Sequence, residues 1–415
     1  MKLLVLADDL TGSLDTGIQF VAGHAKTCVV LNADYPLHKV DPSVQVLVID
    51  TESRHLPPKQ AAEIVQNIVR QAVALQVPYL YKKTDSALRG NVGAELEAAL
   101  KASGAKQLHF IPAFPRVHRS TENGVQLIDG VPVAESVFGK DPFDPVRYYK
   151  VAEFLNSQAE VSVANVPIGA PPSDEPGVVV YDAVTAEDIR THAKHLNETG
   201  KLHIMAGCAG FAAALPEFIP LSGALDAEPQ YNGAFLAVCG SVNPITVAQM
   251  DEAEQNGFDR IRITAQQALT PGFFASTEGL ALLDSWADRL NKGVPGILDS
   301  NPAPGAQTAY EYAELHGLSR EELRVTISDA MGTVLAGLLQ RGVNATMLIT
   351  GGDTLMGFMR TVGVAEIVPV RELMTGTVLS SVEIGGKTYN MISKSGGFGE
   401  KTLVTDLAKL VTQQK

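Results

Sequence analysis

The sequence predicts an α/β protein of two domains, each built on a mostly parallel sheet flanked by helices, with a ligand cleft between them. Short apolar runs rich in β-branched residues alternate with helical patterns along the chain, which is typical of doubly wound parallel sheets. The 415 residues suffice for two domains of ordinary size. Residues 218–234 have no clear periodicity and carry prolines and glycines, so we expect the interdomain linker there.

The first series of strands and helices belongs to a domain at residues 1–222. Strands are expected at "KLLVLA" (2–7), "TCVVLN" (27–32), "VQVLVID" (44–50), "VPYLYKK" (77–83), "QLHFIPA" (107–113) and "GVVVYDA" (177–183). Amphipathic patterns predict helices at 61–75, 91–103 and 185–197. The apolar segment 202–215 closes this domain.

The second series belongs to a domain at residues 233–415. Strands are expected at "AFLAVCG" (234–240), "DRIRITA" (259–265), "GILDS" (296–300) and "TMLIT" (346–350), with helices at 244–257 and 319–342. The segment "SSVEIGGKTYNMISK" (380–394) predicts a β-hairpin that turns at Gly385-Gly386. Because "GGKT" lies in this hairpin and not between a strand and a helix, we reject it as a P-loop.

The composition excludes several classes of protein. The formal net charge is −13 and no long lysine/arginine cluster occurs, which argues against non-specific nucleic-acid binding. Cys28, Cys208 and Cys239 are far apart in or beside apolar runs, as expected for buried small hydrophobes in a reducing compartment. No stretch approaches the ~20 apolar residues of a membrane span, and the N-terminus meets aspartate too soon for a signal peptide. We therefore expect a cytoplasmic protein that does not bind membranes.

Two adjacent aspartates end the first strand, in "LVLADDLTGSLDTG" (4–17). Ligands of open parallel sheets bind beyond the carboxyl ends of the strands. A helix N-cap needs only one carboxylate, so the other is free to accept a hydrogen bond or a proton from a ligand hydroxyl. We assign the local turn or cap to Asp8 and the ligand to Asp9, with Lys83 or Arg89 close enough to offset their repulsion.

A mixed charge cluster follows another strand, in "YKKTDSALRGN" (81–91). Strand alternation points Lys82 and Lys83 to opposite faces. Cations beside Asp85 would suit a ligand that carries both carboxylate and hydroxyl groups, although a solvated surface gives the same pattern. Arg54 in "DTESRHL" could fork onto a carboxylate. The segment "PAFPRVHRSTENG" (112–124) offers His118 and Arg119, or is simply a proline-shaped loop.

The second domain carries three strand–loop–helix junctions of small residues: "CGSVNP" (239–244), "TGGDT" (350–354) and "SGGFGEKT" (395–402). Exposed backbone N–H groups near a helix start cradle phosphates without a lysine. Glycine serves any tight turn, but three such turns in one domain indicate a nucleotide. Asp353 either caps the following helix or faces Mg²⁺ or the transferring phosphoryl group.

Six segments, taken in order, resemble the four-carbon acid sugar kinases: "ADDLTGSLDTG", "KKTDSALRGN", "PAFP", "GSVNP", "GGDT" and "KSGGFG". The resemblance covers essentially the whole chain. It implies an N-terminal domain that binds a sugar acid such as threonate, erythronate or a 3-oxo-tetronate, and a C-terminal domain that binds ATP with Mg²⁺. Phosphate would pass to the terminal hydroxyl of the acid.

The resemblance also implies site residues. The substrate contacts would be Asp9, Arg54, Lys82, Lys83, Thr84 and Asp85. Arg54 and Lys83 would hold the carboxylate of the substrate, and Arg89 is the next candidate for that role. The ATP contacts would be Ser241, Gly351, Gly352, Asp353, Thr354 and Gly396 or Gly397. Asp9, Asp85 and Asp353 are the candidates for the general base. Ser13, Leu14, Ala87 and the residues after "PAFP" depart from the family pattern, which leaves the particular acid open.

Two alternatives share parts of this pattern. A non-catalytic, two-lobed sugar-acid binding protein would have the same architecture, but it would not need three glycine turns in one lobe and would usually be exported. An oxidoreductase acting on the same acids would need a dinucleotide fingerprint, and the sequence has none. The stereochemistry of the substrate, the metal ligands and the oligomeric state stay open. A homodimer is one possible oligomeric state.

Overall fold

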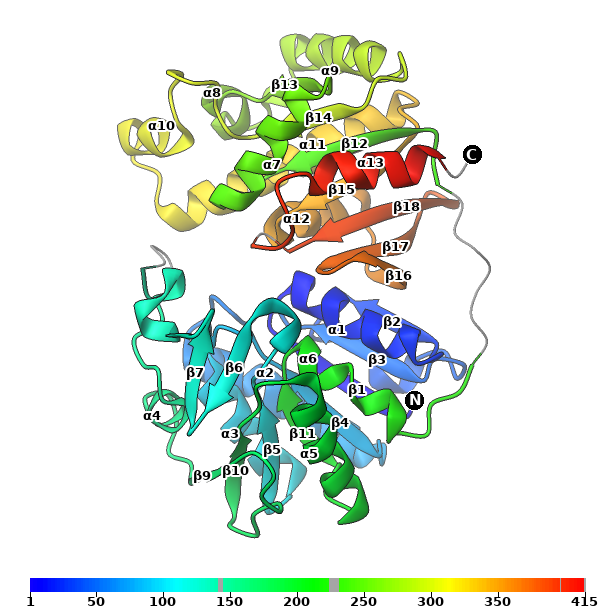
Figure 1. The fold of residues 1–415 in the computed structure, drawn as a ribbon. Helices are drawn as coiled ribbons and strands as arrows, with labels where there is room; N and C mark the ends of the chain where they lie inside the picture. The colour runs from blue at the N-terminus through cyan, green and yellow to red at the C-terminus, as the bar shows by residue number, and fades with distance from the viewer. Residues whose placement is uncertain (141–144, 224–230, 396, 414–415) are drawn as a thin grey trace. The chain divides into compact units, whose positions relative to one another are not determined.

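The computed structural model describes residues 1–140, 145–223, 231–395 and 397–413 (Figure 1). The chain divides into two compact units, Met1–Leu225 and Asp226–Lys415. Each unit holds a mostly parallel sheet with helices around it, which confirms the predicted α/β class. Residues 224–230 of the predicted linker lie outside the described residues. The ligand cleft between the units stays a prediction.

Unit 1 is built on a parallel sheet. Its described strands run in the order β2-β3-β1-β4-β11-β5-β10-β9, and every neighbouring pair is parallel. Their bounds are β1 (Leu3–Ala7), β2 (Thr27–Val30), β3 (Val46–Asp50), β4 (Tyr79–Lys83), β5 (Gln107–Ile111), β9 (Val163–Val166), β10 (Gly177–Tyr181) and β11 (Ile204–Gly207). The six strands predicted at residues 1–183 are confirmed, whereas β9 was not predicted.

Helices cover both faces of this sheet (Figure 1). Strand alternation sends Leu4 and Leu6 of β1 into a core with α2 (Pro58–Ala74) and α3 (Val92–Ser103). The other face carries α1 (Leu10–Ala22) and α6 (Ala209–Ala212). The next helix, α5 (Ala186–Glu198), packs against α6. Thr185 and Asp188 form a capping box that fixes the start of α5.

The segment of the chain between β5 and β9 forms a small antiparallel sheet that was not predicted. Its strands are β6 (Arg119–Glu122), β7 (Val125–Ile128) and β8 (Val131–Pro132). Short helices surround it: η2 (Pro115–Val117), η3 (Val133–Glu135), η4 (Val137–Lys140) and α4 (Val151–Asn156). Unit 1 also contains η1 (Leu37–Lys39) and η5 (Leu215–Glu217).

Unit 2 has a mixed sheet of order β13-β14-β12-β15-β18-β17-β16 in the described residues. The first five strands are parallel, while β17 and β16 run antiparallel. The bounds are β12 (Ala234–Cys239), β13 (Asp259–Arg262), β14 (Gly296–Asp299), β15 (Ala345–Thr350), β16 (Glu366–Met374), β17 (Thr377–Ile384) and β18 (Lys387–Lys394). The predicted hairpin is confirmed, because Ile384 pairs with Lys387 and both turn glycines have positive φ.

The helices of unit 2 are α7 (Pro244–Gln255), α8 (Ala265–Leu269), η6 (Phe273–Ala275), α9 (Thr277–Leu290), α10 (Ala309–His316), α11 (Arg320–Gln340), α12 (Gly352–Val362) and α13 (Leu403–Gln413). Its core joins β12 and β15 to α13 through residues such as Phe235, Leu348 and Leu407. Every helix in the described residues is too short or too polar to cross a membrane. All three cysteines are buried, as expected, and none forms a disulfide with another described residue.

Candidate active site

The carboxyl ends of three neighbouring strands bring the predicted acid-binding residues of unit 1 together. The parallel register places Asp50 of β3, Ala7 of β1 and Lys83 of β4 side by side. The loops that follow these strands carry Arg54 and Asp9, which lie in contact. These polar segments therefore meet at one edge of the sheet, where ligands of open parallel sheets bind.

Arg54 joins the two adjacent aspartates. Its Nε and Nη2 donate to the two carboxylate oxygens of Asp8 at 2.8 and 3.1 Å, and its Nη1 donates to Asp9 Oδ2 at 2.7 Å. Burial opposes ionisation of Asp8, but Arg54 with Lys82 and Lys83 outweighs it and lowers the pKa of Asp8 to about 2. The principal counter-charge is thus Arg54, which was not predicted in this role, while the predicted Lys83 contributes beside it.

The N-cap of α1 is Asp9, so the predicted assignment of the cap to Asp8 was wrong. Asp9 Oδ1 accepts the backbone N–H of Gly12 at 3.0 Å, and its Oδ2 accepts the Thr11 hydroxyl at 2.8 Å. Asp8 is drawn away to the loop after β3, where it binds both the side chain and the backbone N–H of Arg54. The Asp9 side chain keeps 23% exposure against 3% for Asp8, so the cap is also the more accessible carboxylate.

Lys82 and Lys83 lie on opposite faces of the sheet, as predicted. Lys82 Nζ is 2.9 Å from Glu95 Oε2 on α3, and both side chains are buried. Glu95 also accepts a hydrogen bond from Ser53, which ties the loop after β3 to α3. Lys83 lies beside α1, since a Cβ built on Gly12 would be 2.4 Å from its Nζ. Lys82 therefore serves a buried ion pair, and Lys83 alone reaches the α1 side.

The ammonium of Lys83 has no hydrogen bond or ion pair within the described residues, and the residue is 5% exposed. Its neighbours in the register are small, Ala7 on one side and Gly207 on the other. The buried hydroxyl of Thr84, the next residue, also has no hydrogen-bond partner within the described residues. A buried charge without a partner is costly, so this arrangement favours an anionic ligand at Lys83.

Asp85 organises its own loop. Its carboxylate accepts Arg89 Nε and Nη2 at 3.0 and 2.9 Å and the backbone N–H of Ala87 at 3.1 Å. Burial opposes its ionisation, but the guanidinium groups of Arg89 and Arg54 hold the pKa of Asp85 well below its usual range. A carboxylate stabilised in this way is a weak general base.

A phenylalanine from the small antiparallel region contacts two arginines of the site. The guanidinium carbons of Arg89 and Arg119 lie 5.3 and 5.1 Å from the ring centroid of Phe138 in η4, within cation–π range. Arg119 also donates to the hydroxyl of Ser86. His118, the other sequence candidate, is exposed and ends η2 in a left-handed conformation.

Asp50 is a buried carboxyl that sequence reasoning did not single out. Its Oδ1 accepts the N–H of Glu52 at 3.1 Å, whereas its Oδ2 finds no partner among the described residues. Burial, aided by the charge of Asp9, raises the pKa of Asp50 well above its usual range. Burial therefore favours the neutral form of Asp50. The signal in the sequence was an aspartate that ends a buried strand.

Cations and carboxylates meet at this edge of the sheet. Lys82 pairs with Glu95. The carboxylates of Asp8, Asp9 and Asp85 lie among the cations Arg54, Arg89, Arg119 and Lys83, and Glu52 lies near Asp50. Lys83 forms no ion pair within the described residues, which suits a ligand that carries a carboxylate.

In unit 2 the first two glycine turns meet, because they follow the adjacent strands β12 and β15. A Cβ built on Gly240 would lie 1.7 Å from the Thr354 hydroxyl oxygen. A Cβ on Gly351 would lie 3.9 Å from the backbone nitrogen of Ser241. Three residues of the predicted nucleotide site, Ser241, Gly351 and Thr354, therefore come together around Gly240, where a side chain would clash with Thr354.

The third turn follows β18, the next strand in the sheet. A Cβ on Gly397 would lie 3.9 Å from the side-chain nitrogen of Asn243, the N-cap of α7. Gly351 caps α12 with φ of 94° and no side-chain hydrogen bond, which leaves the N–H groups around Gly352 to a ligand. Gly396 lies outside the described residues.

Asp353 lies in the first turn of α12 and forms an ion pair with Arg324 of α11. The cap is Gly351, so of the two predicted roles of Asp353 the cap is excluded. Its side chain is 46% exposed. The described residues contain no group of three or more His, Cys, Asp or Glu that could hold a metal ion. Mg²⁺ commonly needs only one or two carboxylates beside substrate phosphates, and Asp353 fits that requirement.

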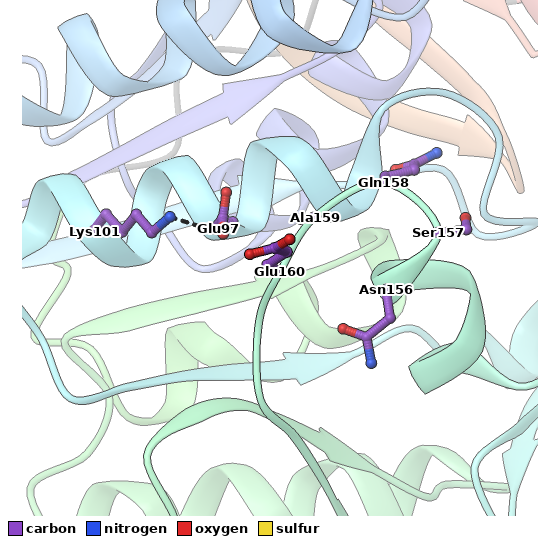
Figure 2. Close-up of a pocket in the computed structure, with 7 residues that line it drawn as sticks. All are labelled: Glu97, Lys101, Asn156, Ser157, Gln158, Ala159 and Glu160. Carbon is purple, nitrogen blue, oxygen red and sulfur yellow. Dashed lines mark ion pairs between the residues drawn. The ribbon is translucent and has the colours of Figure 1, made fainter.

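A separate surface pocket lies along the later half of α3 (Figure 2). Glu97 and Lys101 form an ion pair of 2.8 Å within it. Gln158 points its amide to the start of α3, where it binds the backbone of Gly90 and Gly93. These contacts brace the helix, and the pocket takes no part in the site at the strand ends.

Comparison with known proteins agrees with this division of the chain. Residues 3–215 match the sugar-binding N-terminal domain, and residues 236–404 match the nucleotide-binding C-terminal domain. The D-threonate kinase of Salmonella typhimurium is 30% identical, with 98% of this chain and 97% of that protein covered. The D-erythronate kinase of Heliobacterium modesticaldum is 26% identical, with 96% and 94% covered.

A solved structure of Haemophilus influenzae protein HI1011 shares the fold, with a TM-score of 0.71 at 18% identity over 99% of this chain and 100% of that chain. The fold and the two matched domains thus define a protein with one sugar-binding and one nucleotide-binding domain. The chain belongs to the four-carbon acid sugar kinase family.

Proposed function

We propose that this chain transfers the terminal phosphoryl group of ATP to the terminal hydroxyl of a four-carbon sugar acid. The observation that carries the proposal is the buried Lys83 ammonium without a protein partner, beside Asp9 at the sheet edge. D-Threonate is the first candidate because the relative with 30% identity is a D-threonate kinase. D-Erythronate and 3-oxo-tetronates are the alternatives.

Lys83 binds the carboxylate of the acid in this proposal, and the absence of an ion pair or hydrogen bond at its ammonium within the described residues supports that role. Thr84 offers its hydroxyl as a second contact. Arg54 acts differently from the sequence expectation, because all its guanidinium nitrogens already bind Asp8 and Asp9. It positions these aspartates and does not hold the acid.

The glycine turns hold the phosphates of ATP. Phosphoryl transfer needs mainly positioning and charge neutralisation, and the backbone N–H groups near Ser241, Gly352 and Gly397 are suited to both. Mg²⁺, when bound, neutralises charge on the phosphate oxygens. Asp353 would face the metal, and Arg324 fixes its orientation.

Asp9 orients the acceptor hydroxyl and accepts its proton. It is more exposed than Asp8 or Asp85, and the depressed pKa of Asp85 makes that carboxylate a poorer base. Asp9→Asn should lower kcat by about 100-fold or more. The fold should persist because asparagine caps a helix as well as aspartate does. ADP release and thermal unfolding measure the two effects, and full activity would move the base to Asp85 or Asp353.

A coupled ADP-release assay across four-carbon sugar acids tests the function as a whole. We expect turnover that requires both ATP and one of these acids. Tight binding of an acid without any ADP release would instead support the non-catalytic binding protein. Oxidation of the acid with reduction of a nicotinamide cofactor would support the oxidoreductase.

The predicted cytoplasmic location belongs to the same proposal, since ATP is the second substrate. A homodimer stays a prediction, which sedimentation velocity of the purified chain tests.

A further inference from the structure

Lys394 ends β18 immediately before the third glycine turn. Its side chain is 0% exposed and is among the largest fully buried side chains. Two of its hydrogen-bond partners are neutral: the Thr246 hydroxyl and the Ser395 carbonyl oxygen, each 3.1 Å from Nζ. Thr246 lies in the first turn of α7. The ammonium therefore joins the start of α7 to the start of the third turn.

The sheet register places Lys394 in line with the other two turns. Cys239 of β12 pairs with Thr350 of β15, and Thr350 pairs with Lys394. One residue beyond this row, each strand enters one of the three turns, at Gly240, Gly351 and Ser395. Lys394 therefore ends its strand level with the entrances to the three turns. Its buried ammonium lies at the start of the third turn, next to backbone groups that would face the phosphates.

Two titratable groups lie in line with this ammonium along the sheet, the Cys239 thiol and the Asp299 carboxylate. Burial raises the pKa of the Cys239 thiol to about 12, so the thiol stays neutral below that pH. Beyond Cys239, Asp299 of β14 is bound by Arg260. Burial lowers the pKa of Lys394 to about 8. The free protein therefore holds this proton weakly, and an anion nearby would strengthen its hold.

We propose that Lys394 supplies the positive charge that offsets the nucleotide phosphates at the three turns, and that nucleotide binding fixes its proton. This inference rests on the proposed function, because it takes the turns as the ATP site. Lys394 is a positioning residue that acts through the low-dielectric interior, where a charge is felt over a longer range than in water. No lysine was predicted for these turns from the sequence.

The proposal has a signature in ATP binding by the wild-type chain. Above pH 8 the free protein loses the proton while the complex keeps it. The affinity for MgATP should then fall by about tenfold per pH unit. Near pH 8 each binding event should take up about half a proton. Isothermal titration calorimetry from pH 7 to 9.5, in buffers of different ionisation enthalpy, measures both quantities. The phosphates of MgATP are themselves ionised over this range, because bound Mg²⁺ lowers the pKa of the terminal phosphate.

Two variants separate charge from packing. Lys394→Met fills the same space without a charge, so the proton uptake and the steep pH dependence should vanish and MgATP affinity at pH 7 should fall about 10- to 100-fold. Its melting temperature should stay equal or rise, because no charge is buried. Lys387→Met, exposed on the same strand, is the matched control and should keep the wild-type values.

The outcomes distinguish a failure of the role proposed for Lys394 from a failure of the proposed kinase function. MgATP binding with a flat pH dependence and no proton uptake in the wild-type chain would overturn the role of Lys394 and leave the kinase in place. A chain that binds no MgATP at any pH would overturn the proposed function itself. The wild-type titrations decide this even if Lys394→Met fails to fold.

Discussion

Two adjacent lysines show how strand alternation separates structure from function. Lys82 turns toward α3 and completes a buried pair with Glu95, whereas Lys83 turns toward α1 and meets no protein partner in the described residues. Both are buried at the same strand end. Their difference lies only in what each face offers, so the pair provides its own matched controls.

Replacing each lysine by methionine should therefore have opposite consequences. Lys83→Met should raise KM for the acid about 10- to 100-fold, because one charge-assisted hydrogen bond to the acid is lost. The melting temperature of this variant should be unchanged or higher. Lys82→Met should lower the free energy of unfolding by about 3 kcal/mol or more, because Glu95 stays buried without its partner. Steady-state kinetics and denaturant unfolding measure both variants. Equal effects on stability would contradict the separation.

The sequence predicted which residues gather at this edge but not how they pair. Alternation was sufficient to place Lys82 and Lys83 on different faces. The helix cap was assigned to Asp8 and not to Asp9, because the deciding contact is Arg54, some 45 residues away in the chain. Glu95 gave no local signal of burial, since its burial depends on neighbouring strands and helices, whereas Asp50 was marked only by its position at the end of a buried strand.

At the scale of elements, the nucleotide site depends on turns packed against each other. The Gly240 turn and the start of α12 leave no room for a side chain at position 240, where a Cβ would be 1.7 Å from Thr354 Oγ1. The turns therefore act as one unit and not as three independent loops.

Gly240→Ala should accordingly displace Thr354 and weaken ATP binding about 10-fold or more, with a smaller effect on KM for the acid. Thr354→Ala in the same chain should restore part of the affinity, because it removes the clashing hydroxyl. Gly233→Ala, where a Cβ would have only ordinary contacts at 3.6 Å, is the control. Unchanged ATP affinity in Gly240→Ala would refute the packed-turn description.

The small sheet β6–β8 was missed although its turns were visible. Asn123-Gly124 and Asp129-Gly130 are typical hairpin turns with positive φ at both residues. The strands between them are short and partly polar, so no alternation was evident. The hairpin at 380–394 was predicted because each of its strands is eight residues long. The missed sheet matters because it leads to Phe138 at Arg89 and Arg119.

At the scale of the whole molecule, strand identity was predictable and strand order was not. Each apolar run is a local pattern, but the order β2-β3-β1-β4-β11-β5-β10-β9 depends on long crossover connections. The assembly of the site depends on that order, because it makes β3, β1 and β4 neighbours.

The buried core of unit 1 also makes its stability depend on pH. His109 of β5 hydrogen-bonds Tyr181 at 2.9 Å, and burial lowers its pKa to about 4. The unfolded chain binds this proton below pH 6.5, so the native state loses stability as the pH falls from 6.5 through 4. The loss from this one group should reach roughly 3 kcal/mol.

Urea unfolding at pH 7 and pH 4.5 measures this effect. His109→Gln should reduce the difference between the two pH values, because glutamine does not titrate, while the exposed His203→Gln should leave it in place. An undiminished difference in His109→Gln would assign the acid sensitivity to other groups.

The central claim is phosphoryl transfer from ATP to the terminal hydroxyl of a four-carbon sugar acid, and phosphorus-31 NMR of the reaction product tests it most directly. With D-threonate, MgATP and the purified chain, we predict a phosphomonoester signal split by the two protons of the terminal carbon, in step with ADP formation. Inorganic phosphate alone, or an ester on another carbon, across threonate, erythronate and 3-oxo-tetronate would contradict the account.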